Sequence, residues 1–379
     1  MPAPALSSLA DLRPGEGRRV ILAATWFCCL LTGNYTLRPL RDAMGVAGGV
    51  DSLPWMFTAT FLVMLAVVPL FGLAVARLGR ARLVRVVHHV FAAQLLIFFV
   101  LMQGWLGEDA QVQLWTARVF FVWTSVFNLF VISLFWSVMA DLFSGADARR
   151  LFGLIATGGT IGALLGPGLG GALALTVGPA YLPLVVALLL EVAAVCMHGV
   201  GTHASPAPTE PDPDATPVGG HPLAAVADLM RSPTLLRLCA YVLVLTTTST
   251  LLYLIQARIV ADATSDDQSR TVLFASVDLA INVLTLLVQA LLTGRLLRRV
   301  GVGWALATVP LLCLLGFAAV AALPILPVLI GAQILRRSCD YAIARPAREV
   351  VYTGVDRSQR YKAKSFIDTV VYRGGDALA

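Results

Sequence analysis

Residues 180–200 read AYLPLVVALLLEVAAVCMHGV and contain a single Asp, Glu, Lys or Arg residue, Glu191. A helix of this length rises about 30 Å, which is the thickness of the hydrocarbon core of a bilayer. Similar apolar segments recur along the chain at roughly 20–38, 54–76, 84–106, 114–140, 151–176, 234–257, 271–294, 303–323 and 325–345. An eleventh begins near Ala363 and reaches Ala379, which is too short a stretch to cross. We therefore predict an all-α transmembrane protein with ten full spans and a partial eleventh.

The composition of the 379 residues supports membrane insertion. Hydrophobic residues make up 58% and charged residues 13%, and the mean hydropathy is +0.80. A soluble domain carries about a quarter charged residues, so this chain lacks the charge to cover a globular surface. The net charge of +6 arises mostly from short loops rather than from one polar helix face, so we expect no nucleic-acid partner.

Motifs for enzyme chemistry are missing from the sequence. The six cysteines form no CxxC pair, and there is no His-rich metal spacing, no GxxxxGK[ST] loop, no GxSxG and no HExxH. We expect no enzyme activity, no cofactor and no metal site.

Loop charges predict the orientation and the domain organisation. Arg77 and Arg80 follow the second span and Arg149 and Arg150 follow the fourth, whereas the alternate loops are acidic or nearly uncharged. By the positive-inside rule the N-terminus is cytoplasmic. A Pro-, Asp- and Thr-rich stretch within the long loop after the sixth span reads as a flexible linker. We predict an N-terminal six-helix bundle (1–200), a cytoplasmic linker (201–232) and a C-terminal bundle (233–379) that is truncated in helix 11.

The two predicted halves share a loop motif. A Gly-x4-Arg-x-Gly sequence ends at Gly79 after the second span and at Gly301 after the eighth, with Arg77 and Arg299 as its arginines. Two six-span halves with a shared loop motif resemble the major facilitator superfamily, whose halves alternate around a central site. That resemblance implies a two-bundle transporter in which Arg77 and Arg299 are candidates for cytoplasmic gating.

A second repeat and a glycine stripe concern helix packing. The first span ends in RPLRD (38–42) and the tenth in RPARE (345–349). Either proline ends each helix while arginine reaches the interface, or the two segments are basic clusters at the mouths of a central cavity. Small residues at four-residue intervals on the fifth span predict close approach of a neighbouring helix; they are Gly158, Gly162, Gly166 and Gly170.

Ionisable side chains within the spans are candidates for function because they are costly in a membrane. They include Glu191, Asp278, Arg336, Arg337, Asp340, Asp368, Arg373 and Asp376. The arginine fork binds phosphate or carboxylate bidentately, so several deep arginines favour an anionic substrate. The competing interpretation is that these arginines pair internally with the aspartates.

Three segments resemble the ATP:ADP antiporter (nucleotide transporter) family. They are NYTLRPLRD at 34–42, SLFW at 133–136 with RRLFG at 149–153, and YKAKSFID at 361–368 followed by RGGDAL at 373–378. The resemblance implies nucleotide exchange in a bacterial inner membrane.

Within that resemblance, two positions match the family's pattern and two depart from it. Arg41 and Arg373 stand where the family places two important basic residues. Thr124 and Tyr253 stand where it carries acidic residues, which is a departure from its pattern.

These observations lead us to expect a monomeric secondary transporter, surrounded by lipids, for a small anionic, phosphorylated solute such as ATP or ADP. The expected substrate-binding residues are Tyr35, Arg38, Arg41, Arg345 and Arg373, and the expected gating or coupling residues are Arg77, Asp278, Arg299, Asp340 and Asp376. One alternative is a proton-coupled exporter of a small organic solute in which Asp278 or Glu191 carries the proton. Another is a transport-silent membrane scaffold or sensor.

Overall fold

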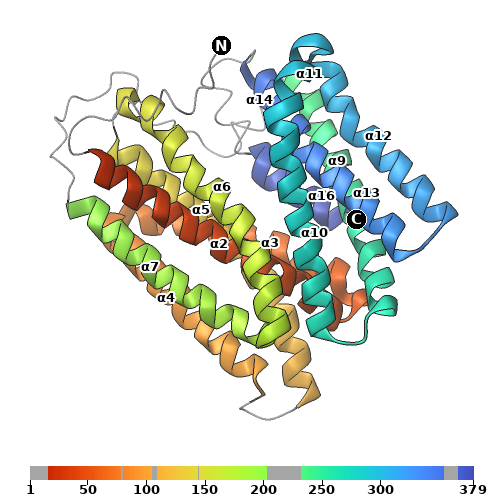
Figure 1. Cartoon of the computed structure of the whole chain (residues 1–379), viewed down its shortest axis with the longest axis horizontal. Helices are drawn as coiled ribbons and strands as arrows, with labels where there is room; N and C mark the ends of the chain where they lie inside the picture. Colours follow the sequence, from red (N-terminus) through yellow and green to blue (C-terminus); the bar gives the residue numbers. More distant parts are fainter. Residues whose placement is uncertain (1–15, 78–79, 105–108, 144, 203–231, 354–365) are drawn as a thin grey trace. The chain divides into compact units, whose positions relative to one another are not determined.

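The computed structural model describes residues 16–77, 80–104, 109–143, 145–202, 232–353 and 366–379, and the regular elements in these ranges are all helical (Figure 1). In chain order they are α2 (Glu16–Ala47), η2 (Val50–Ser52), α3 (Leu53–Arg77), α4 (Arg80–Met102), α5 (Ala110–Leu142), α6 (Gly145–Thr176), η3 (Pro179–Tyr181), α7 (Leu182–Thr202), α9 (Pro233–Ala263), α10 (Asp267–Val288), η4 (Gln289–Thr293), α11 (Gly294–Arg299), α12 (Gly301–Ala322), α13 (Leu326–Cys339), η5 (Asp340–Ala344), α14 (Arg345–Thr353), η6 (Ile367–Val371) and α16 (Tyr372–Leu378). The predicted all-α transmembrane fold is confirmed.

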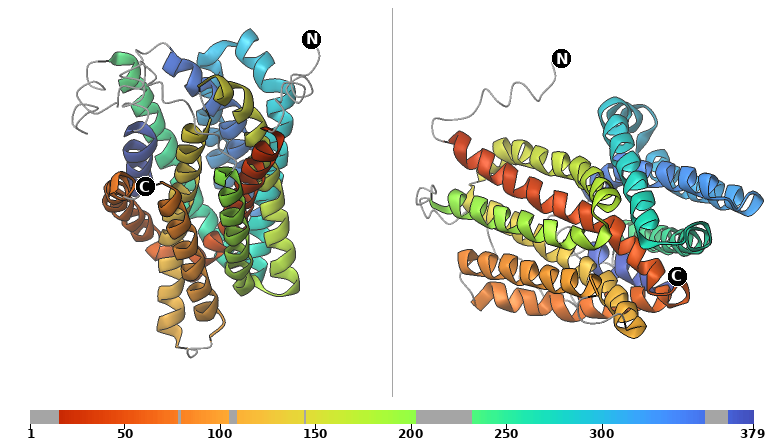
Figure 2. Two further views of the ribbon diagram at one scale, coloured as in Figure 1. Left: turned by 90° about the vertical axis from the view of Figure 1, so that its left-hand side faces the viewer. Right: turned by 60° about the horizontal axis from the view of Figure 1, so that its bottom comes forward.

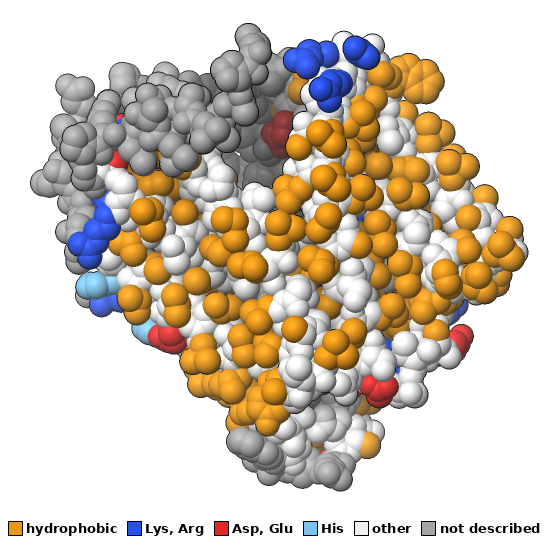
Figure 3. Space-filling view, viewed as in Figure 1, with side chains coloured by type: hydrophobic (Ala, Val, Ile, Leu, Met, Phe, Trp, Pro, Cys, Tyr) orange, Lys and Arg blue, Asp and Glu red, His pale blue; other side chains and the backbone are white. Residues whose placement is uncertain are grey.

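The apolar runs form helices because a chain in hydrocarbon must satisfy its backbone hydrogen bonds internally. Within the described ranges, nine helices are long and apolar enough to cross a membrane. Hydrophobic side chains spread over much of the described surface in Figure 3, and exposed examples include Leu188, Val195 and Leu314. The tenth predicted span is divided into α13, η5 and α14, and the start of the eleventh lies partly outside the described residues.

The interpretation that proline ends the first and tenth spans is wrong. Pro39 lies inside α2, which continues to Ala47, and Pro346 lies inside α14, which continues to Thr353. Proline removes the hydrogen bond to the carbonyl four residues earlier. For Pro346 that carbonyl belongs to Ala342 in the π-helix η5, and it accepts a 2.8 Å hydrogen bond from the Thr293 hydroxyl of η4. A neighbouring helix therefore replaces the lost bond.

Two compact units divide the chain. The first takes its described residues from Met1–Gly48, Ala66–Thr209 and Asp266–Ser276, and the second from Gly49–Leu65, Glu210–Ser265 and Val277–Ala379. Helices α3 and α10 each contribute one part to each unit. The bundle boundaries at 200 and 233 stay predictions.

In the first unit, helix α2 occupies the centre. It packs against α5, α6 and α7, and Figures 1 and 2 show it in red between α6 and α7. Its buried Trp26 meets the Phe135 ring of α5 edge-on at 5.0 Å and donates its indole N–H to His88 of α4 at 3.2 Å. The core of this unit is therefore built on a helix that also carries Arg38 and Arg41.

The glycine stripe on α6 lies against the backbone of α2, which confirms the predicted close packing. A Cβ atom added at Gly158 would lie 2.0 Å from the Ala24 carbonyl oxygen, and one at Gly162 would lie 2.5 Å from that of Cys28. Only hydrogen side chains fit at this distance, because real Cβ atoms do not approach other atoms so closely.

We expect Gly158→Ala to lower the stability of the protein by about 1–3 kcal/mol, the usual cost of overpacking. Gly168→Ala is the matched control, because it adds the same methyl group to the same helix with no atom within 4 Å. The melting temperatures of both purified variants in detergent test this. Equal melting of the two variants would contradict the packing argument.

Candidate functional site

Arg41 is held by α5 and by its own neighbour on α2. Its guanidinium lies 4.0 Å from the centre of the Phe121 ring, a cation–π contact. Its Nε donates to the Phe121 carbonyl at 3.4 Å, and its Nη1 lies 3.3 Å from Asp42 Oδ1. The side chain of Arg41 is 17% exposed. Arg41 is thus fixed in direction and charge-balanced, and part of it stays accessible.

Tyr35 and Arg38 precede Arg41 on the same helix. Arg38 lies three residues from each of the other two, so the three side chains leave adjacent turns of α2. Both Tyr35 and Arg38 are half-buried. The structure therefore brings the predicted residues of the first unit together, and it does so because α2 continues through Pro39.

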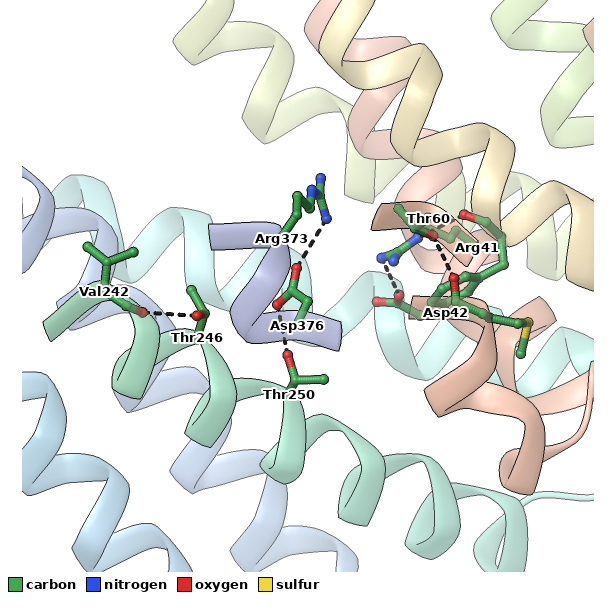
Figure 4. A network of polar contacts seen from close by, with 10 residues as sticks. Arg41, Asp42, Thr60, Val242, Thr246, Thr250, Arg373 and Asp376 are labelled. Atoms are coloured by element: carbon green, nitrogen blue, oxygen red, sulfur yellow. Dashed lines mark hydrogen bonds and ion pairs between the residues drawn. The ribbon is translucent and has the colours of Figure 1, made fainter. Parts of the chain in front are cut away.

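In the second unit, Arg373 and Asp376 form a cluster where α16 docks on α9. Figure 4 shows the Asp376 carboxylate between Arg373 and Thr250. Its Oδ2 lies 3.3 Å from Arg373 Nη1, and its Oδ1 accepts the Thr250 hydroxyl at 2.8 Å. Thr247 donates to the Gly375 carbonyl at 3.1 Å. Asp376 thereby positions Arg373, whose side chain is 25% exposed.

Arg345 and Asp340 form a second pair in the same unit, at the junction of η5 and α14. Arg345 Nε lies 3.4 Å from Asp340 Oδ2, and its guanidinium lies 4.3 Å from the centre of the Tyr341 ring. Tyr372 of α16 interacts electrostatically with Asp340 and Arg345 of this pair as well as with Asp376.

Asp278 on α10 pairs with Arg337 on α13. The distance from Asp278 Oδ1 to Arg337 Nη2 is 2.7 Å, and the two side chains are 3% and 14% exposed. The sequence left open whether Asp278 is paired or protonated, and the structure supplies the partner.

Residues 21–338 match the sequence profile of the Major Facilitator Superfamily. This chain belongs to that superfamily. The transporter is therefore an integral membrane protein of the secondary-transporter class.

Three solved transporter structures share the fold of this chain. A bacterial homolog of the human lysosomal transporter Spinster has a TM-score of 0.61 at 15% identity, covering 97% of this chain and 81% of the other. The nucleoside transporter NupG gives 0.60 at 15%, with 97% and 89% coverage. A bacterial homologue of the iron transporter ferroportin gives 0.66 at 12%, with 95% and 89% coverage. These identities show the fold alone, and no match was found among curated proteins.

The predicted gating arginines of the transporter, Arg77 and Arg299, each lie at the end of a helix. Arg77 is the last residue of α3, and its side chain lies outside the described residues, as does that of Asp368. Arg299 ends α11 and is exposed. In Figure 3 arginine side chains gather at the top, where Figure 1 labels α11.

Sequence reasoning did not assign Arg336 to the site. This side chain is 8% exposed and joins a polar network of α9 and α13 with Ser249, Gln256 and Gln333. The signal was present in the spacing, because Ser249 and Gln256 are seven residues apart and Gln333 and Arg336 three, so each pair shares one helix face. Both faces had to be known to meet before the network was visible.

Proposed function

We propose that this transporter carries an anionic, phosphorylated solute by alternating access, and that nucleotide exchange is its specific form. The observation that carries the proposal is the arrangement of Arg41 and Arg373. Each is a partly exposed arginine, and each is 3.3 Å from a carboxylate of the same helix. Each also stands at a basic position of the nucleotide-transporter motif.

The paired carboxylates explain how an empty site can hold two arginines in a membrane. Asp42 and Asp376 balance the charge while no substrate is bound, because an uncompensated charge in a span is costly. A phosphate group offers the guanidinium a stronger, bidentate partner and competes with the carboxylate for it. Tyr35, Arg38 and Arg345 are the further substrate contacts in this proposal.

The other parts of the transport cycle follow from the same proposal. The two halves, 1–200 and 233–379, move about the central site, and Arg77 and Arg299 gate it at the cytoplasmic side. Asp278, Asp340 and Asp376 are the further gating or coupling residues. Following the loop charges, we place the N-terminus in the cytoplasm and the protein, as a monomer, in a bacterial inner membrane.

Thermal unfolding of the full-length protein in detergent tests the proposal. ATP and ADP should raise the melting temperature and adenosine should not, because only a ligand that binds the folded state stabilises it. In Arg41→Ala and Arg373→Ala the ligand concentration for a given shift should rise about tenfold or more, the loss expected for one charged hydrogen bond. Arg295→Ala, which removes an exposed arginine of α11, is the matched control.

A wild-type protein that no nucleotide stabilises at millimolar concentration would overturn nucleotide carriage.

The second candidate function is proton-coupled export of a small organic solute. The buried Asp278–Arg337 pair favours it, since a carboxylate and an arginine 2.7 Å apart form a pair that a proton can open. Transport that stops when the proton gradient is dissipated, and that nucleotides do not affect, would identify that mechanism.

A further inference from the structure

The arginines of the second unit differ in how their charge is balanced. Arg337, Arg345 and Arg373 lie 2.7, 3.4 and 3.3 Å from carboxylate oxygens. Arg336 is more deeply buried than any of them, yet no carboxylate oxygen of the described residues lies within 4.0 Å of its guanidinium. Among the described residues of the second unit, Arg336 is therefore a buried positive charge whose hydrogen-bond partners are all neutral.

Those neutral partners form a continuous hydrogen-bonded network. Gln333 Oε1 accepts from Arg336 Nε at 3.3 Å and from Nη2 at 2.9 Å, and Ser249 Oγ accepts from Nη1 at 2.6 Å. Gln333 in turn donates its amide N–H to Gln256 Oε1 at 2.6 Å. A guanidinium has five N–H donors. Three are engaged here, so two remain for a ligand.

Apolar clusters flank the network along the helices. Leu245 and Leu252 of α9 precede and follow Ser249, and they belong to two separate clusters. The first contains Leu245, Val309, Cys313 and Ala344, and the second Leu252, Val320 and Leu329. Because Ser249 lies near the middle of α9, the network is far from both helix ends. A lipid phosphate, which stays at the membrane surface, does not reach this depth.

We propose that Arg336, with Ser249, Gln256 and Gln333, forms an anion subsite that binds one phosphate group of the transported solute; this inference rests on the function proposed above. The amides and the hydroxyl hold the guanidinium in place without neutralising it, whereas a carboxylate in their place would repel the ligand. The cost of the buried charge is offset when the anion binds. The empty subsite thus lowers the stability of the folded protein and raises its affinity for the anion.

The subsite predicts an unusual response to mutation. Without ligand, Arg336→Gln should melt at or above the wild-type temperature, because it removes a buried charge that has no carboxylate partner. In the same variant the concentration of ADP or inorganic phosphate needed for a given thermal shift should rise about ten- to a hundredfold. Arg336→Lys keeps the charge and loses the fork, so its response should be intermediate. Arg295→Gln should match the wild type in both measurements.

Two outcomes overturn the inference in distinguishable ways. If Arg336→Gln melts below the wild type and keeps the wild-type response to ADP and phosphate, Arg336 is structural, and the proposed function stands without the subsite. If ATP, ADP and phosphate all fail to stabilise the wild-type protein, the proposed function fails, and the phosphate subsite fails with it.

Discussion

Replacing Arg337 by leucine should destabilise the protein by about 3–5 kcal/mol, the cost of removing one partner from a buried ion pair. The change takes away the guanidinium 2.7 Å from Asp278 and leaves that carboxylate buried, with 3% of its side chain exposed. The loss of stability should exceed the loss caused by replacing any exposed arginine, since surface ion pairs contribute about 0–1 kcal/mol. Thermal or denaturant unfolding of the purified protein in detergent measures it.

The double variant Asp278→Leu, Arg337→Leu is the control for this expectation. It removes both charges, and replacing a whole buried pair by apolar side chains is often neutral or stabilising. Most of the lost stability should therefore return. If Arg337→Leu alone melted like the wild type, the ion pair would contribute nothing measurable to stability. The neighbouring Arg336→Gln should leave the stability unchanged or raise it, although the two residues are adjacent in sequence.

Gly375→Ala should disrupt the docking of α16 on α9 and weaken ligand binding through Arg373. The added Cβ would lie 1.8 Å from Thr246 Oγ1, 3.0 Å from its Cβ and 3.2 Å from the Leu243 carbonyl oxygen. Thr246 cannot rotate away without losing its 2.9 Å hydrogen bond to the Val242 carbonyl, drawn in Figure 4. We expect a loss of about 1–3 kcal/mol in stability.

The functional consequence follows from the same displacement. If α16 moves, the hydrogen bond from Thr250 to Asp376 lengthens, and Asp376 no longer holds Arg373 in place. The thermal shift caused by ADP should therefore fall together with the melting temperature.

An adjacent residue provides the control for Gly375. Gly374→Ala adds the same methyl group where no atom lies within 4 Å, and it should behave like the wild type. Combining Gly375→Ala with Thr246→Ala removes the closest contact and should restore part of the stability. Equal ADP responses in the Gly374 and Gly375 variants would show that α16 does not position Arg373.

Much of the fold could be predicted because membrane insertion is a local property of the chain. An apolar run long enough to span hydrocarbon must form a helix wherever it occurs, so residues 180–200 could be assigned without knowing their neighbours. The close packing of the α6 glycines could be predicted in the same way, because a row of small residues on one helix face lets a neighbouring backbone approach. The tenth span was less regular than predicted, with a π-helix at Asp340–Ala344.

The candidate site was only partly predictable from sequence. The motif residues Arg38 and Arg41 do lie on adjacent turns, because neighbours on one helix are fixed by its period. The effect of Pro346 was misjudged, since the hydroxyl that replaces its missing hydrogen bond comes from Thr293 on another helix. Which arginine has a carboxylate partner could not be read either, because Arg336 and Arg337 look alike in the sequence.

The sequence by itself determined that this protein is a helical membrane protein, where most of its spans lie, and which ionisable residues enter them. Those properties depend on hydropathy and helix period, which act over a few turns of one chain segment. Only the tertiary structure decided which charges are balanced. Arg337 meets Asp278 across two helices, whereas Arg336, one residue earlier, faces Ser249 and Gln333. Adjacent residues on a helix point about 100° apart, so packing alone gives them different partners.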